Sequence, residues 1–401
     1  MKLFERIGIG ITFTLTAFVT VCTGQAGVPQ ESQRQAALAL EQQGKNAEAE
    51  ATWKAFLKAQ PGSAEAFAHL GLLEARQEHY KEAVLFYRRA MALHPAMPSL
   101  RMNLGLALFK GGELKQAILE FKPLLKTEPP TSPDGQRLAI LIGMAHYGLN
   151  EYAEAVPYLK EAAARDPQNL QLRLALAHSC LWSRQYPCVL DTYHEILMLN
   201  AESAEADMLA GEALDELKEY DGAIQQFRAA VKANPKEPDV HFGLGYILWT
   251  QRQYDEAARE FQAELTNDPH HVQSLAYLAD ANMQLNHPEV ALPLLEKVKV
   301  MNPSLVLGRL DLGILYGNAG RQQDALHELI VAARLAPDDV NVHWRLARLY
   351  REMGKMGEAK AEFDKASSLN KATDNALLDK MSGAHPHPSP AQEPSATKVD
   401  K

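Results

Sequence analysis

Residues 98–131 read PSLRMNLGLALFKGGELKQAILEFKPLLKTEPPT and contain the pattern that decides the fold. Small residues stand at Gly105 and Ala117, and the large Phe121 follows Ala117 by one helical turn. A glycine, Gly112, separates two stretches whose apolar residues are spaced by three and four positions, as on buried helix faces. The stretch therefore predicts two short helices joined by a tight turn.

The same pattern recurs along the chain at a 34-residue interval, with one longer step of 38 residues between Pro129 and Pro167. The interval is marked by a proline near the end of most units: Pro61, Pro95, Pro129, Pro167, Pro235, Pro269, Pro303 and Pro337. Ten units result: 30–63, 64–97, 98–131, 136–169, 170–203, 204–237, 238–271, 272–305, 306–339 and 340–373. Fixed-period similarity is typical of stacked repeats, because each unit needs its neighbours to bury its apolar faces.

Four positions within the unit, here called columns, carry the pattern. Column 8 holds only Gly or Ala, and column 20 holds Ala in every unit except the fifth, which has Val189. Column 24 holds a large residue each time: Trp53, Tyr87, Phe121, Leu159, Tyr193, Phe227, Phe261, Leu295, Leu329 and Phe363. We expect the two helices to approach closely at column 8, with column 20 as the small partner. Column 15 holds Gly44, Gly112, Asn150, Asn286, Gly320 and Gly354, as a left-handed helix stop requires.

These columns resemble the tetratricopeptide repeat, and the resemblance covers about residues 30–373. It implies an all-α fold: an α-solenoid, wound as a right-handed superhelix, of about ten helix hairpins. It also implies a concave groove lined by the first helix of each unit. The fold alone assigns no function, because such repeats serve many unrelated tasks.

The two ends of the chain differ from the repeats. Lys2 and Arg6 precede an uncharged run over residues 7–30, and Gly24 and Ala26 suit cleavage after Ala26. We predict a signal peptide over residues 1–26 and an exported protein of a bacterial-type periplasm or cell envelope. An uncleaved anchor in the inner membrane is the alternative, because the run is nearly long enough to span a bilayer. Residues 374–401 are predicted to be a short helix end and a disordered, proline-rich tail.

The fifth unit is the least regular and carries Cys180 and Cys188 on either side of its turn. We expect two small buried thiols there. A disulfide is the alternative, since the compartment would be oxidising and the bridge needs only Cα atoms within reach.

Composition and motifs exclude several classes of function. The net charge of -9 argues against nucleic-acid binding, which depends on a basic surface. The sequence has no Gly-rich phosphate loop, no His-Glu-x-x-His helix and no Gly-x-Ser-x-Gly elbow. Because the repeats account for nearly every residue, we expect no enzyme, no cofactor and no metal.

Columns 2, 5, 9 and 12 of the first helices form a stripe apart from the packing columns 4, 7, 8 and 11. The stripe is rich in Met and aromatic residues, with Trp182 beside it: Met102, Leu106, Phe109, Ile140, Met144, Tyr147, Leu174, His178, Leu181, Phe242, Tyr246 and Trp249. An exposed surface of this kind predicts docking of a partner peptide or amphipathic helix. The alternative is that the protein itself fills the groove.

Charge changes along the stripe. The sixth unit has an acidic segment, and the tenth has a basic one around a tryptophan: Glu205, Glu212, Asp215 and Glu216, then Trp344, Arg345, Arg348 and Arg351. This predicts a partner segment with an apolar middle, a basic part at the sixth unit and an acidic part at the tenth. A polar cap on the last repeat is the alternative reading of the arginines.

The sequence therefore predicts a non-catalytic scaffold or adaptor of the cell envelope whose groove binds a protein segment. The alternative is a structural solenoid that associates with copies of itself while its groove is filled internally. A membrane contact is expected only through the N-terminal anchor.

Overall fold

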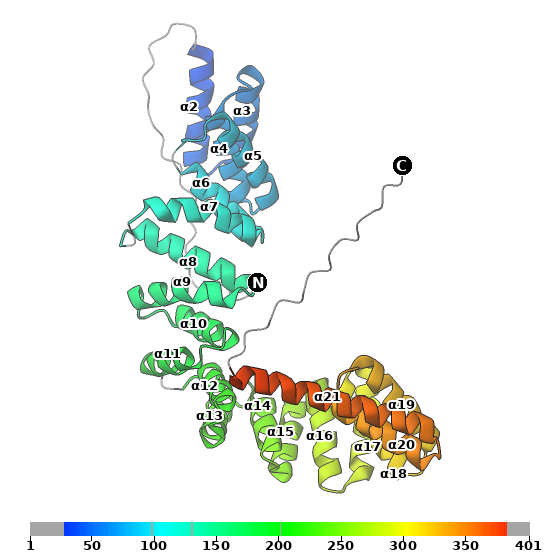
Figure 1. The fold of residues 1–401 in the computed structure, drawn as a ribbon. Coiled ribbons are helices and arrows are strands. Elements are labelled where there is room, and N and C mark those ends of the chain that lie inside the picture. The colour runs from blue at the N-terminus through cyan, green and yellow to red at the C-terminus, as the bar shows by residue number, and fades with distance from the viewer. Residues whose placement is uncertain (1–27, 98, 130, 201, 383–401) are drawn as a thin grey trace, which may run out of the picture. The chain divides into compact units, whose positions relative to one another are not determined.

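The computed structural model describes residues 28–97, 99–129, 131–200 and 202–382 (Figure 1). These residues form twenty helices and no strand, so the predicted all-α fold is confirmed. The predicted signal peptide and the proline-rich tail from residue 383 lie outside the described residues. Within the described ranges, no helix combines the length and the apolar character that crossing a membrane requires.

The described residues fall into two compact units, one ending at Val240 and the other starting at His241, and each is an all-α solenoid of helix hairpins. The first contains α2 (Val28–Gln42), α3 (Asn46–Ala59), α4 (Ala64–Arg76), α5 (Tyr80–Leu93), α6 (Leu100–Lys110), α7 (Leu114–Thr127), α8 (Pro133–Gly148), α9 (Tyr152–Arg165), α10 (Leu170–Trp182), α11 (Tyr186–Leu199), α12 (Ala204–Glu216) and α13 (Tyr220–Ala233). The second contains α14 (Val240–Thr250), α15 (Tyr254–Asn267), α16 (Val272–Gln284), α17 (Pro288–Met301), α18 (Val306–Asn318), α19 (Gln322–Leu335), α20 (Val340–Glu352) and α21 (Met356–Ser382). Within each unit, successive helices pack together, for example α12 with α13 and α18 with α19. First helices also contact the first helix of the next repeat, as in the pairs α16 with α18 and α18 with α20.

The helices of each hairpin meet most closely at column 8. A Cβ atom on Gly245 would lie 2.7 Å from Cε1 of Phe261, and one on Gly313 would lie 2.6 Å from Cγ of Leu329. The side chain that fills this space is thus the large residue of column 24, whereas the sequence analysis paired column 8 with the small residue of column 20. The alanines of column 20 are buried beside it, and their small size lets the ring one turn further on reach across.

The turn within each hairpin has the same backbone in all ten repeats. Column 15 has a positive φ throughout, between 59° and 82°: Gly44, Glu78, Gly112, Asn150, Arg184, Lys218, Arg252, Asn286, Gly320 and Gly354. Each turn is closed by the same backbone bond, exemplified by Gln253 N–H donating to the Leu248 carbonyl at 2.9 Å. The predicted left-handed stop is confirmed at its six Gly and Asn positions. The same left-handed backbone also occurs at the four charged residues of column 15, which incur a conformational penalty in this region.

A second contact between the paired helices joins column 4 to column 23. Column 4 is buried in most repeats, as a packing column should be, and in some repeats its buried side chain is polar. The contact between the two columns is an ion pair or hydrogen bond in four repeats: Arg101 with Glu120 at 3.2 Å, and His241 with Glu260, Arg309 with Glu328 and His343 with Glu362, each at 2.6 Å. Burial alone would raise the pKa of Glu328, but hydrogen bonds from Lys299 and Arg309 bring it below its usual range.

Cys180 on α10 and Cys188 on α11 form a disulfide, so the expectation of two free buried thiols is wrong. The short turn between the helices reverses the chain and brings the two Cα atoms to 5.9 Å, within the range that a disulfide spans. The fifth hairpin is therefore closed covalently.

We predict that Gly245→Ala lowers the free energy of unfolding of the C-terminal unit by about 1–3 kcal/mol, because the buried ring of Phe261 has no free space to move into. Denaturant titration followed by circular dichroism measures this. Gly357→Ala is the matched control, since nothing lies within 4 Å of its added Cβ. It should be neutral or stabilise by up to about 1 kcal/mol. Equal effects of the two substitutions would contradict the steric account.

We predict that Arg252→Gly raises the free energy of unfolding by about 0.5–1 kcal/mol, because glycine tolerates the left-handed turn without steric cost. The reverse substitution, Gly320→Arg, should lower it by a similar amount, since its added side chain meets open space but the same backbone strain. Denaturant titration of both variants compares them directly. A loss of stability in the glycine variant would show that the arginine side chain, and not its backbone, is what matters.

Candidate functional site

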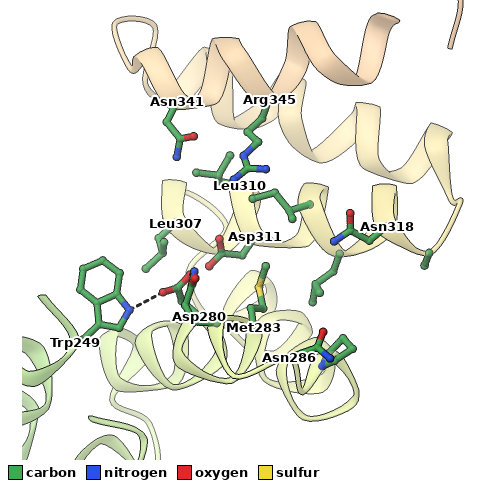
Figure 2. A pocket seen from close by; sticks show the side chains of 15 residues that line it. Trp249, Asp280, Met283, Asn286, Leu307, Leu310, Asp311, Asn318, Asn341 and Arg345 are labelled. Carbon is green, nitrogen blue, oxygen red and sulfur yellow. Dashed lines mark hydrogen bonds between the residues drawn. The ribbon is translucent and has the colours of Figure 1, made fainter. Parts of the chain in front are cut away.

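The C-terminal unit contains a pocket of about 620 Å³ between the first helices of its hairpins (Figure 2). Its size is in the range of ligand sites in proteins. Most of its lining comes from columns 2, 5, 6, 9, 12 and 13 of α14, α16, α18 and α20: Trp249, Asp280, Met283, Gln284, Leu307, Leu310, Asp311, Ile314, Asn318, Asn341 and Arg345. The stripe of columns 2, 5, 9 and 12, which we predicted to line the groove, thus lines a pocket in this unit. Residues of columns 6 and 13 also line the pocket.

Asp280 is held in place by its neighbours on both oxygens. Trp249 Nε1 donates to Oδ2 at 2.5 Å, and Gln284 Nε2 donates to Oδ1 at 3.2 Å. The side chain is only 6% exposed. These two bonds fix the Asp280 carboxylate beside the indole of Trp249, so the orientation of this acid in the pocket is set.

Asp311 lies next to Asp280 and is the more unusual of the two acids. It is 3% exposed, and its Oδ2 has no hydrogen-bond partner among the described residues. Burial raises its pKa well above the usual range, the charge of Asp280 adds to the rise, and Arg345 opposes it. Figure 2 shows the two carboxyl groups facing each other, with Arg345 extending from α20 into the same space.

Arg345 approaches these acids without closing an ion pair to either. Its guanidinium lies 5.4 Å from the ring centroid of Trp344, and its buried Nε has no hydrogen-bond partner within the described part of the chain. Arg348 lies 5.0 Å from the same ring, and Arg351 lies 5.8 Å from the ring of Phe363. The predicted basic segment is therefore built on stacked aromatic and guanidinium groups.

Aromatic side chains of α14 and α16 form a wall beside the pocket. Tyr277 lies 5.1 Å from Trp249, 5.4 Å from Tyr246 and 5.9 Å from Phe242, measured between ring centroids. Tyr246 is 36% exposed, so the wall is open to solvent. Burial, together with Tyr246 and the nearby acids, raises the pKa of Tyr277 to about 12, so its hydroxyl is neutral near pH 7.

In the N-terminal unit the predicted stripe is mostly covered. Five of its members are buried in the core, and three are half-buried against it: Leu106, Phe109, Met144, Leu174 and Leu181, then Met102, Ile140 and Tyr147. Trp182 is the exception at 63% exposed, and its ring stacks on Tyr152 at 6.2 Å. Little of this part of the stripe faces solvent.

The predicted acidic segment also lies in the N-terminal unit, on and next to α12. Glu205 pairs with His178 at 3.1 Å, and Glu216 accepts a hydrogen bond from the Tyr186 hydroxyl at 3.2 Å. Glu212 is exposed and Asp215 is half-buried. The basic segment belongs to the C-terminal unit.

The structure brings two predicted residues, Trp249 and Arg345, to one pocket, and it adds two that the sequence analysis missed, Asp280 and Asp311. Tyr277, which was also missed, lies beside the pocket against Trp249. The signal for Asp280 was a carboxylate in column 9 of an otherwise apolar stripe, and Asp311 stands in column 6. Among the described residues, no group of three or more His, Cys, Asp or Glu side chains is arranged to hold a metal ion.

Models of the tetratricopeptide repeat match residues 34–98, 74–139, 140–181, 242–305 and 340–373, and a model described as TPR repeat matches residues 211–251. Together these matches cover more than half of the chain, and the chain belongs to the tetratricopeptide repeat family. No curated protein matches its sequence. Proteins of this family act in general as interaction scaffolds.

Solved structures of similar arrangement include YrrB, a TPR protein with an unusual peptide-binding site, at 20% identity over 47% of this chain and 97% of that one, with a TM-score of 0.38. A thermophilic TPR protein of Thermus thermophilus, TTC0263, is 24% identical over 44% of this chain and all of its own, with a TM-score of 0.37. The human IFIT1 dimer with m7Gppp-AAAA is 15% identical over 83% and 88%, with a TM-score of 0.40. At these TM-scores, the similarity to these structures does not indicate the function of this chain.

We predict that Asp311→Asn stabilises the C-terminal unit increasingly as pH rises from about 4 to about 8. A carboxyl whose folded pKa exceeds its unfolded pKa contributes stability at low pH and loses it as pH rises. Each unit of difference between the two pKa values is worth about 1.4 kcal/mol. Urea denaturation at several pH values measures the difference between variant and wild type.

The control for this series is Asp364→Asn, which removes an exposed acid on α21. Its effect on the free energy of unfolding should stay nearly constant over the same pH range. If both variants follow the same pH profile, Asp311 does not titrate as its surroundings require.

Proposed function

We propose that the protein is a non-catalytic interaction scaffold and that the groove of its C-terminal unit binds a peptide or amphipathic helix of a partner protein. The observation that carries the proposal is the pair of buried polar atoms without partners, Asp311 Oδ2 and Arg345 Nε, in one open pocket among the described residues. Buried polar atoms in folded proteins nearly always have a hydrogen-bond partner, so this pocket is suited to a ligand that supplies one.

The surroundings of the pocket support a protein segment as the ligand. Tyr246 on α14 and Trp344 on α20 are exposed aromatic residues on the first helices before and after those that carry the two acids, and such residues are enriched at protein interfaces. Leu307 and Ile314 add apolar surface, while Asn318 and Asn341 offer amide groups to a main chain. Apolar anchors with a few polar groups between them are typical of grooves that bind peptides.

We further propose that the scaffold acts in an oxidising compartment outside the cytoplasm, in a periplasm or cell envelope. The support comes from the secretory pattern of the N-terminal sequence and from the Cys180–Cys188 disulfide, a bond that is rare in reducing compartments.

The test is site-specific photo-crosslinking in the native envelope fraction. A benzophenone amino acid replaces Asn318, an exposed residue at the pocket, and in a control protein it replaces Val300, an exposed residue of α17. We expect one protein to be crosslinked at position 318 and not at position 300. The yield should fall at least about tenfold when Tyr246→Ala and Trp249→Ala are added, because both aromatic contacts are lost.

Circular dichroism must first show that the double variant is as helical as the wild type. A product of the same size from both crosslinking positions would contradict groove binding. A product that contains only a second copy of this chain would favour the structural, self-associating solenoid instead.

A further inference from the structure

The acid pair indicates which chemical group of the partner enters the pocket. We infer that Asp311, with Asp280 and Trp249 beside it, binds the basic side chain of a lysine or arginine in the partner segment. The inference rests on the proposed function, that the groove of the C-terminal unit binds a protein segment, and it names the chemistry that selects this segment.

Asp280 and Asp311 differ in their hydrogen bonds, so we expect them to contact a ligand differently. Both oxygens of Asp280 already accept bonds, from Trp249 and Gln284, so Asp280 adds negative charge in a fixed place. Asp311 Oδ2 accepts none within the described part of the chain, although the side chain lines the pocket and is nearly fully buried. An ammonium or guanidinium group of the ligand would donate a hydrogen bond to Asp311 Oδ2 and balance the negative charge of both acids.

The walls of the pocket suit the rest of a basic side chain. The rings of Trp249 and Tyr277 lie next to the acids, and aromatic faces attract cations. Leu307, Leu310 and Ile314 line the pocket and would cover the methylene stem of a lysine or arginine. An acidic side chain, by contrast, would face the charge of Asp280 and bring no donor for Asp311 Oδ2.

Arg345 limits where the cation can lie. It enters the pocket from α20 and offsets part of the rise in the pKa of Asp311, yet it forms no ion pair with either acid among the described residues. Its unpartnered Nε is placed to donate to a carbonyl oxygen of the bound main chain, with the basic side chain on the opposite side, toward α16. The pocket would thus recognise one basic side chain of the ligand and one main-chain carbonyl oxygen next to it.

Binding of a cation should be linked to proton release. The charged or titratable groups that face Asp311 are Asp280 and Tyr277 on α16 and Arg345 on α20. In the empty pocket these surroundings and burial favour the protonated form of Asp311, whereas a bound cation favours its carboxylate. Affinity should therefore rise with pH over the range in which Asp311 holds its proton in the free protein.

The test selects displayed random peptides of about twelve residues on the purified full chain and measures the enriched peptides by fluorescence polarisation. We expect a basic residue at one fixed position of the enriched set. Replacing it by norleucine, or making Asp311→Asn in the protein, should each weaken binding by about tenfold or more. The two changes combined should cost little more than one alone, because both remove the same contact.

Three matched measurements separate the pocket from general charge effects. Asp364→Asn, which removes an exposed acid outside the pocket, should leave the affinity within about twofold of wild type. Asp280→Asn keeps an acceptor for Trp249 but removes its charge, so it should weaken binding less than Asp311→Asn does. The affinity of the wild type should increase between about pH 5 and about pH 8, and that of Asp311→Asn should not.

The outcomes distinguish the two proposals. Enriched peptides without a basic position, or with one whose binding is the same in Asp311→Asn, overturn the inference. The proposed function then still stands if Tyr246→Ala with Trp249→Ala abolishes binding. Failure to enrich any peptide on the folded protein overturns both.

Discussion

The contact between column 8 and column 24 is the steric constraint on which the rest of the structure depends. Where a glycine faces Phe261 or Leu329, there is no space for even one added carbon, so the two helices of that hairpin have a single close-packed arrangement. The turn and the polar contact between columns 4 and 23 then hold the same arrangement at other points. Because these contacts occupy one side of the first helix, columns 2, 5, 9 and 12 are left on the side away from its partner.

What that free side carries differs between the two units. In the N-terminal unit, Phe109, Met144 and Leu181 turn into the core, and the stripe contributes to stability. In the C-terminal unit, acidic groups replace apolar ones at Asp280 and Asp311, and a hollow forms between the first helices. Burying a carboxyl group without a partner, as at Asp311, is unfavourable, so the hydrophobic effect alone does not explain why this residue is there. The binding role that we propose would account for it.

Much of the fold followed from the sequence, because periodic features repeat the same evidence many times. The hairpins, the close approach at column 8 and the left-handed turn at Gly112 or Gly320 all come from columns that can be compared across repeats. The site could not be found in this way. It depends on individual residues of neighbouring repeats, such as Asp280 with Asp311, whose contact is a matter of stacking and not of spacing within one repeat. The disulfide was missed for a related reason, since its formation depends on a distance across a turn that spacing alone does not give.

The turns have a consequence for how such a protein varies. Glu78, Arg184, Lys218 and Arg252 adopt the backbone that Gly320 adopts, so this turn tolerates side chains of either charge at a modest conformational cost. The fold thereby leaves one solvent-facing position per hairpin open to Gly, Asn, Glu, Arg and Lys alike. Except at Asn286, which lines the pocket, substitutions accumulated at these positions would change the surface charge of the protein step by step while the helices, their packing and the pocket stay as they are.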